Sequence, residues 1–175
     1  MSEGAVPERI PTSEIPALVR DVGIEPGAAF ERDGTRVWDL ELDGDRRRGL
    51  KVSLIDEGRD DGAVVVWAHL APPLGDGLRK AYRRLLEWND RYVYAKFGVA
   101  ADGRPVLSVE IPSQRADART LLEALARVVF IADELLDETA AWIWIGGRQP
   151  ADSDAPRRNR ALLERHRSLV GRLEG

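Results

Sequence analysis

The alternation of apolar and polar residues between Val37 and Leu70 predicts three strands in succession. Residues 37–42, VWDLEL, and residues 50–54, LKVSL, place an apolar side chain at every second position, which is typical of a half-buried strand. Residues 63–70, AVVVWAHL, are apolar on both faces, which favours a strand at the centre of a sheet. Polar turns that contain glycine separate the segments, so we expect an antiparallel meander. Its inward side chains should be Trp38, Leu40, Leu42, Leu50, Val52 and Leu54.

The segment from Trp88 to Pro112, WNDRYVYAKFGVAADGRPVLSVEIP, alternates on both sides of a glycine-containing turn and predicts a second hairpin. Its inward side chains should be Val93, Ala95, Phe97, Val99, Leu107, Val109 and Ile111. A two-residue turn would mix the two faces of the hairpin. A three-residue loop with Gly103 in a left-handed bulge keeps both sets in the core, and the register that we predict pairs Phe97 with Val109.

The same register assigns several side chains to the outer face of the hairpin. Lys96 would lie opposite Glu110, beside Tyr92 and Tyr94, and Trp67 on the central strand can join this face. Tyrosine and tryptophan provide large contact areas at little entropic cost, so interfaces are rich in them. Aromatic residues are also exposed on strands simply through cross-strand pairing, so both interpretations stay open.

Apolar residues at a helical period predict four helices. The first is capped by Ser13 and ends at Gly23, the second begins near Gly77, the third near Asp117, and the last spans residues 158–173. The apolar face of the second helix should include Tyr82, Leu85 and Leu86. The apolar arc of the third helix is wide, and Phe130 and Ile131 extend it to the far side. Such a helix contacts more than the sheet, either a partner subunit or the C-terminal tail.

These elements predict an α+β fold in the order α-β-β-β-α-β-β-α, followed by a C-terminal helix. We expect an antiparallel five-stranded curved sheet with the helices packed on one face. Residues 1–145 should form this domain, and residues 146–175 should form a linker and a basic amphipathic helix.

The composition fits one domain and narrows the range of partners. The chain has 175 residues, a net charge of -4 and no cysteine. The negative charge argues against a general polyanion binder, and the absence of cysteine excludes disulfides and thiolate chemistry. The N-terminal MSEGAVPERIPTSE lacks the features of a secretion leader, and no apolar run approaches the roughly 20 residues of a membrane span. We therefore expect a cytoplasmic protein without a membrane partner.

The charge is distributed unevenly along the chain. From Pro156 onward there are six arginines and two glutamates, a net charge of +4, so residues 1–155 carry -8. A basic amphipathic helix of this kind can dock on its own acidic body or reach a partner, and we favour docking on the body.

Few residues are candidates for catalysis. His69 lies on a strand and His166 within an arginine-rich helix, and neither has a serine or acid at a recognisable spacing. We therefore predict no catalytic, cofactor-binding or metal-binding residue. One alternative is an enzyme that uses Lys96, Glu110 or His69 in a pocket beside the sheet. Another is a nucleic-acid adaptor that uses the arginine-rich tail, although nucleic acid is not the partner that we expect.

Two segments carry a resemblance to a known family. LLEWNDRYVYAKFGVAADGRPVLSVEIP, followed by LLEALARVVFIADELLD, resembles the YbjN-like proteins and the related type III secretion chaperones over about Val19 to Asp137. The resemblance implies an α+β domain, often dimeric, without catalytic residues. Secretion chaperones of this fold bind an extended segment of a client, and YbjN-like members look regulatory or chaperone-like. The segment WIWIGG and the basic C-terminal helix are similar to those of actinobacterial members.

The sequence thus predicts a non-enzymatic protein- or peptide-binding module of chaperone-like or regulatory type. We expect an extended peptide or a protein as its client, and a homodimer is a further expectation. The predicted contact residues are Trp67, Tyr92, Tyr94, Lys96, Glu110, Phe130 and Ile131.

Overall fold

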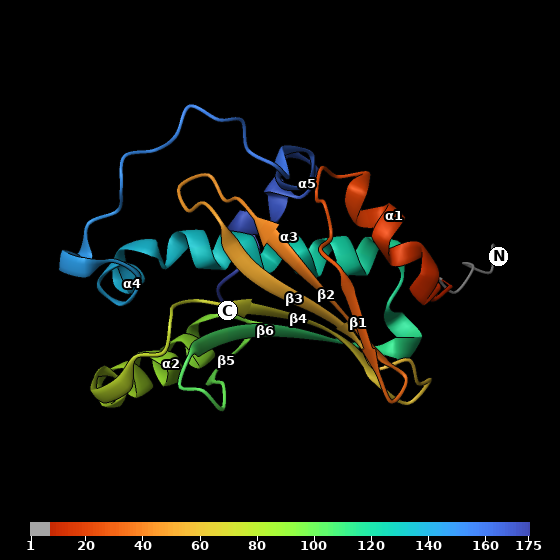
Figure 1. The fold of residues 1–175 in the computed structure, drawn as a ribbon, viewed down its shortest axis with the longest axis horizontal. Helices are drawn as coiled ribbons and strands as arrows, with labels where there is room; N and C mark the ends of the chain where they lie inside the picture. Colours follow the sequence, from red (N-terminus) through yellow and green to blue (C-terminus); the bar gives the residue numbers. More distant parts are fainter. Residues whose placement is uncertain (1–7) are drawn as a thin grey trace.

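The computed structural model describes residues 8–175 and confirms the α+β class and the antiparallel sheet (Figure 1). The start of the N-terminal segment considered above lies outside the described residues. The strands are β1 (Ala29–Arg32), β2 (Thr35–Leu42), β3 (Leu50–Asp56), β4 (Ala63–His69), β5 (Lys96–Val99) and β6 (Pro105–Pro112). They lie in the order β1-β2-β3-β4-β6-β5, so the predicted meander is β2 to β4 and β4 is central, as expected.

The sheet has six strands, and the prediction of five was wrong. The additional strand, β1, pairs with β2 through a two-residue turn in which Asp33 and Gly34 both have positive φ angles. An Asp-Gly pair is a typical hairpin signal. All four residues of β1 are exposed, so its sequence shows no alternation of core and surface positions.

The helices are α1 (Ile15–Arg20), α2 (Leu78–Arg91), α3 (Ala118–Glu134), α4 (Leu136–Ile143) and α5 (Arg160–Arg165). Figure 1 shows α3 running across the strands, with α1 and α5 beside it near β2, and α2 beside β5. The predicted start of α3 is confirmed, since the Asp117 side chain accepts the Thr120 N–H at 2.7 Å. The predicted cap of α1 by Ser13 was wrong, because Glu14 precedes the helix and makes no capping bond. The predicted last helix is shorter, since a 3₁₀ segment, Arg167–Arg172, follows α5.

The wide apolar arc of α3 is buried between the sheet and the C-terminal tail. Phe130 and Ile131 are 5% and 0% exposed, and the leucines of the tail that belong to the same core are Leu162, Leu163, Leu169 and Leu173. Both residues were predicted to contact a client, and this prediction was wrong because both side chains are buried, Phe130 of them beside the tail residues Arg167 and Leu173. The guanidinium of Arg167 lies 5.4 Å from the centre of the Phe130 ring.

Polar contacts between the tail and the β2–β3 turn hold this packing in place. The side chain of Asn159, fully buried, accepts the N–H of Asp43 at 2.6 Å and donates to its C=O at 2.9 Å. Arg158 forms an ion pair with Glu41, and Arg167 forms one with Asp45. The basic tail therefore docks on acidic groups of its own body.

The second hairpin has the predicted loop but a different register. Ala100 donates its N–H to the C=O of Arg104, so residues 101–103 form a three-residue loop, and Gly103 has a φ of +84°, as expected. Phe97, however, lies opposite Leu107, and Lys96 lies opposite Ser108. The predicted and observed registers differ by two residues, so both keep Phe97 on the core face. Alternation has a period of two and therefore cannot distinguish them.

The buried face of α2 also differs from the prediction. Tyr82 and Leu86 are 48% and 69% exposed, whereas Ala81, Leu85 and Trp88 are buried. The helix continues to Arg91 through residues that we assigned to the hairpin, and the large side chain of Trp88 lies on its buried side.

Within residues 8–175, no helix combines the length and the apolar character that crossing a bilayer requires.

Candidate functional site

The seven predicted contact residues do not form one surface. Tyr92 is only 2% exposed, and its ring packs against Phe97 with 5.8 Å between ring centres. Its backbone forms an isolated β-bridge with Glu174 in the tail. Burial of the Tyr92 side chain raises the pKa of its hydroxyl. Tyr92 is therefore a core residue, as Phe130 is, and the prediction that it lies on the outer face was wrong.

Trp67, Lys96 and Glu110 share the sheet face opposite the core. Trp67 is half-buried and lies opposite Ser108, whose other neighbour is Lys96. Lys96 reaches diagonally to Glu110, with 2.8 Å between Nζ and the carboxylate, and both side chains are largely exposed. An exposed pair of this kind contributes about 0.5 kcal/mol to stability.

The outer edge of β5 is closed by a side chain from α2. The Asn89 amide donates to the C=O of Phe97 at 3.0 Å and accepts its N–H at 2.7 Å. One side chain thus occupies both backbone groups that Phe97 would offer to another strand. The Trp88–Asn89 pair therefore joins α2 to the sheet, with Trp88 packed 5.4 Å from the Phe97 ring and Asn89 bonded to its backbone.

The hydrogen bonds of β6 show which of its residues face β4. Leu70 donates its N–H to the C=O of Pro105. At the other end, Ser113 donates its N–H to the C=O of Gly62. Each bond joins two residues that lie directly opposite each other when the β4–β6 pairing is extended by one residue at either end. Hydrogen-bonded positions alternate along an antiparallel strand, so the odd-numbered residues of β6 bond to β4. The even-numbered residues therefore direct their N–H and C=O groups to the opposite side, where β5 lies.

β5 ends before it has paired the whole of β6. The ladder stops at Lys96 opposite Ser108. The N–H and C=O of Glu110 and the C=O of Pro112 therefore have no backbone partner within residues 8–175. The residue that would pair with Glu110 if the register continued is Tyr94.

Tyr94 ends the ladder because its backbone is left-handed, with a φ of +58°. This conformation costs a non-glycine residue of the order of 1–2 kcal/mol. The tail helps to hold it, since Val93 donates its N–H to the C=O of Leu173 at 3.2 Å. The Arg127 guanidinium lies 5.5 Å from the centre of the Tyr94 ring. Tyr94 is thereby 81% exposed beside the open edge, so its predicted exposure is correct.

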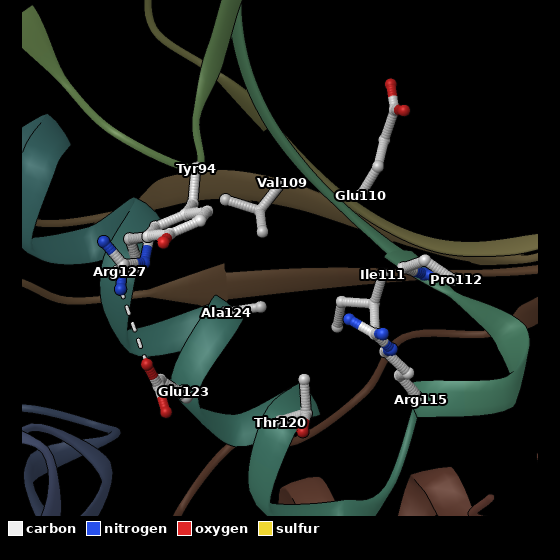
Figure 2. Close-up of a pocket in the computed structure, with 10 residues that line it drawn as sticks. All are labelled: Tyr94, Val109, Glu110, Ile111, Pro112, Arg115, Thr120, Glu123, Ala124 and Arg127. Carbon is white, nitrogen blue, oxygen red and sulfur yellow. Dashed lines mark hydrogen bonds and ion pairs between the residues drawn. The ribbon is translucent and has the colours of Figure 1, made fainter.

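A groove of about 290 Å³ lies between this edge of β6 and α3 (Figure 2). Its apolar lining comes from Val109, Ile111 and Pro112 of β6 and from Ala124 of α3, with Thr120 beside it. Figure 2 shows the Tyr94 ring over Arg127 at one end, Arg115 near Ile111 at the other, and Glu110 pointing away from the groove. The arrangement offers backbone hydrogen-bonding groups on one wall and a small apolar floor.

The positive groups of the groove differ in how they are balanced. Arg127 is 7% exposed and bonds to Glu123 at 3.4 Å and to the C=O of Val93 at 3.5 Å. Arg115 is exposed, and no acidic side chain in the described part of the chain pairs with it. Neither arginine was among the predicted site residues, because an arginine beside a turn or within a helix carries no local signal of a groove.

The groups considered for catalysis are spread over the outer face. His69 lies opposite Lys51 and Val106, in a different cross-strand row from Lys96 and Glu110. Burial, and to a smaller extent Arg104, lowers the pKa of His69, so its neutral form is favoured. Among the described residues, no three His, Asp or Glu side chains gather as metal ligands would.

The match to a known family includes both the groove and the open edge. The family model named YbjN, described as "Putative bacterial sensory transduction regulator", matches residues 15–143, about three quarters of the chain. These residues run from the first residue of α1 to the last of α4, so Tyr94, β6 and α3 lie within the match and the docked tail lies outside it. No curated protein matches the chain. A match over this share of its length shows that the chain belongs to the YbjN family.

Proposed function

We propose that the protein is a non-enzymatic regulatory or chaperone-like module that binds an extended segment of a client protein. The segment would add to the sheet as a short strand beside Glu110. The observation that carries this proposal is the open edge of β6, where a left-handed Tyr94 interrupts the ladder. Strand addition is a common mode of peptide recognition, because main-chain bonds give affinity and alternate side chains give specificity.

The groove provides pockets for those alternate side chains. A strand that pairs with Glu110 would direct its neighbouring residues to the face of Val109 and Ile111, above Ala124 of α3. The exposed Tyr94 ring would cover one end of the segment. The volume of about 290 Å³ lies at the lower limit for small-molecule sites, roughly 300–1,000 Å³, and suits a few side chains.

Two further features support the binding role over the alternatives. The family is described as a regulator, which suits a protein that acts through contacts with a partner. Lys96 and Glu110 form an exposed ion pair with each other, whereas a catalytic acid–base pair would lie in an enclosed site within reach of a substrate. We place this function in the cytoplasm, a compartment compatible with a chain that has no cysteine.

Peptide display against the full chain tests the proposal. Random 12-residue peptides would be selected on the wild-type protein, and their affinities measured by fluorescence anisotropy on Tyr94→Ser and on Phe30→Ser. Phe30 is the matched control, since it is a 63% exposed aromatic residue at the other edge of the sheet. We expect at least fivefold weaker binding to Tyr94→Ser and unchanged binding to Phe30→Ser. Equal affinities for all three proteins would contradict the proposal.

A further inference from the structure

We infer that the groove selects a particular client segment, with two apolar side chains at alternate positions and a carboxylate two positions beyond them. The inference rests on the proposed function and adds the chemistry of the client to it. It is carried by the charges at the two ends of the groove, which are balanced at one end and unbalanced at the other.

The apolar part of the pattern follows from the spacing of β6. Val109 and Ile111 both face the groove, and Glu110 between them faces away (Figure 2). In an added strand the residues opposite Val109 and Ile111 would also face the groove, since directly opposite residues share a face. The apolar floor, which Ala124 completes, therefore favours apolar side chains at these two positions.

The acidic part follows from the groups that remain without a partner. Arg127 already bonds to Glu123 and to a main-chain oxygen, and Glu110 pairs with Lys96 outside the groove. Arg115 is left, with no acidic partner in residues 8–175. A 3₁₀ turn, Ser113–Arg115, directly follows Pro112, and Arg115 is its last residue. The Arg115 side chain points towards Ile111 (Figure 2).

The order of the pattern follows from this placement. Along the direction of β6, the groove presents Val109, then Ile111, then Arg115. The client should therefore present, in the same direction, an apolar residue, any residue, an apolar residue, any residue and an acid. A carboxylate at the last position can form a charge-assisted, bidentate contact with the planar Arg115 guanidinium.

The selected 12-residue peptides test the inference together with Arg115→Gln. Arg79→Gln is the matched control, because Arg79 is exposed on α2 and loses the same charge. We expect the Tyr94-dependent peptides to carry two apolar residues at alternate positions and an aspartate or glutamate two positions beyond the second. Their dissociation constants should rise at least fivefold with Arg115→Gln, remain unchanged with Arg79→Gln, and lose their Arg115 dependence when the acid is replaced by its amide.

Each other outcome overturns a defined part of the account. If the Tyr94-dependent peptides carry no acid, or bind Arg115→Gln as tightly as wild type, the inference falls and the proposed function stands. If no selected peptide depends on Tyr94, both fall. If a 20-nucleotide single-stranded DNA displaces the peptides in an Arg115-dependent manner, Arg115 binds nucleic acid and not a client carboxylate, and the inference falls.

Discussion

At the residue scale, the site depends on the backbone of Tyr94. The sequence correctly predicted that Tyr94 is exposed and that Phe97 is buried, because alternation reports which side chains face the core. It did not predict that the ladder ends at Tyr94. Left-handed residues are recognised in a sequence as glycine or asparagine, and nothing around Tyr94 distinguishes it from a strand residue.

Replacing Tyr94 by two small residues separates the cost of the backbone from the role of the ring. Tyr94→Ala and Tyr94→Gly remove the same side chain, but only glycine adopts a positive φ without steric cost. We expect the glycine variant to be more stable than the alanine variant by about 1 kcal/mol, measured by urea unfolding. An alanine variant that is as stable as the glycine variant would show that the backbone is not held left-handed in solution.

Asn89 shows a related limit of sequence reasoning. The Trp88–Asn89 pair stands out in the sequence, yet its role as a clasp on Phe97 requires that α2 pass beside β5. The partner is eight residues away, and no periodic pattern connects the two.

The loss of the Asn89 amide should be costly. Asn89→Ala leaves the N–H and C=O of Phe97 without partners, so we expect a loss of about 1–3 kcal/mol in the free energy of unfolding. Asp90→Ala is the control, because Asp90 is an exposed neighbour on the same helix and should change stability by less than about 0.5 kcal/mol. If urea unfolding gives equal losses for the two variants, the hydrogen bonds between Asn89 and the backbone of Phe97 contribute nothing to stability.

At the element scale, periodicity identified most strands and the start of α3. It did not identify the register of the second hairpin or the segment that covers the outer side of α3. The register of β5 was wrong by two residues, which leaves every side chain on its correct face. The surface of α3 that we assigned to a client is covered by the tail, because leucines that are distant in the sequence supply the missing layer. The charge pattern of the tail did predict its docking on the body.

The ion pairs of the tail predict a dependence of stability on pH. Hydrogen bonds from Lys51 and then Arg158 lower the pKa of Glu41, and one from Arg167 lowers that of Asp45. A folded-state pKa below the unfolded value contributes stability at higher pH that is lost as the pH falls through the folded value. The wild type should therefore be more stable than Glu41→Gln/Asp45→Asn at pH 7. The difference should shrink as the pH falls below about 4, because the two carboxylates then protonate in the unfolded chain before they do so in the folded protein. A difference that stays constant down to pH 2.5 would contradict this assignment.

At the scale of the whole molecule, a second surface besides the groove beside Glu110 is open to a partner, an apolar surface on α2. The α2 surface is formed by the exposed Tyr82 and Leu86 and continues over Phe97 and Val99, around a hollow of about 440 Å³. The sequence assigned Tyr82 and Leu86 to the core, because a helical stripe does not report how far around the helix the core extends.

We propose that a second copy of the chain packs on this α2 surface, in line with the dimers that the family resemblance implies. Sedimentation equilibrium of the wild type should show a dimer, and Leu86→Asp should raise its dissociation constant at least tenfold. Phe30→Asp, at a similarly exposed residue, should have no effect. A wild type that stays monomeric at about 100 μM, far above a typical Kd of a specific interface, would contradict the proposal.

Hydrogen exchange at one amide tests the central claim, that the edge of β6 is open at Glu110 and accepts a strand. The Glu110 N–H faces the open side, whereas that of Val109 faces β4. In the free protein we predict fast exchange for Glu110 and slow exchange for Val109. A saturating Tyr94-dependent peptide should slow Glu110 at least tenfold. Slow exchange of Glu110 without a peptide, or an unchanged rate with the peptide bound, would contradict the account.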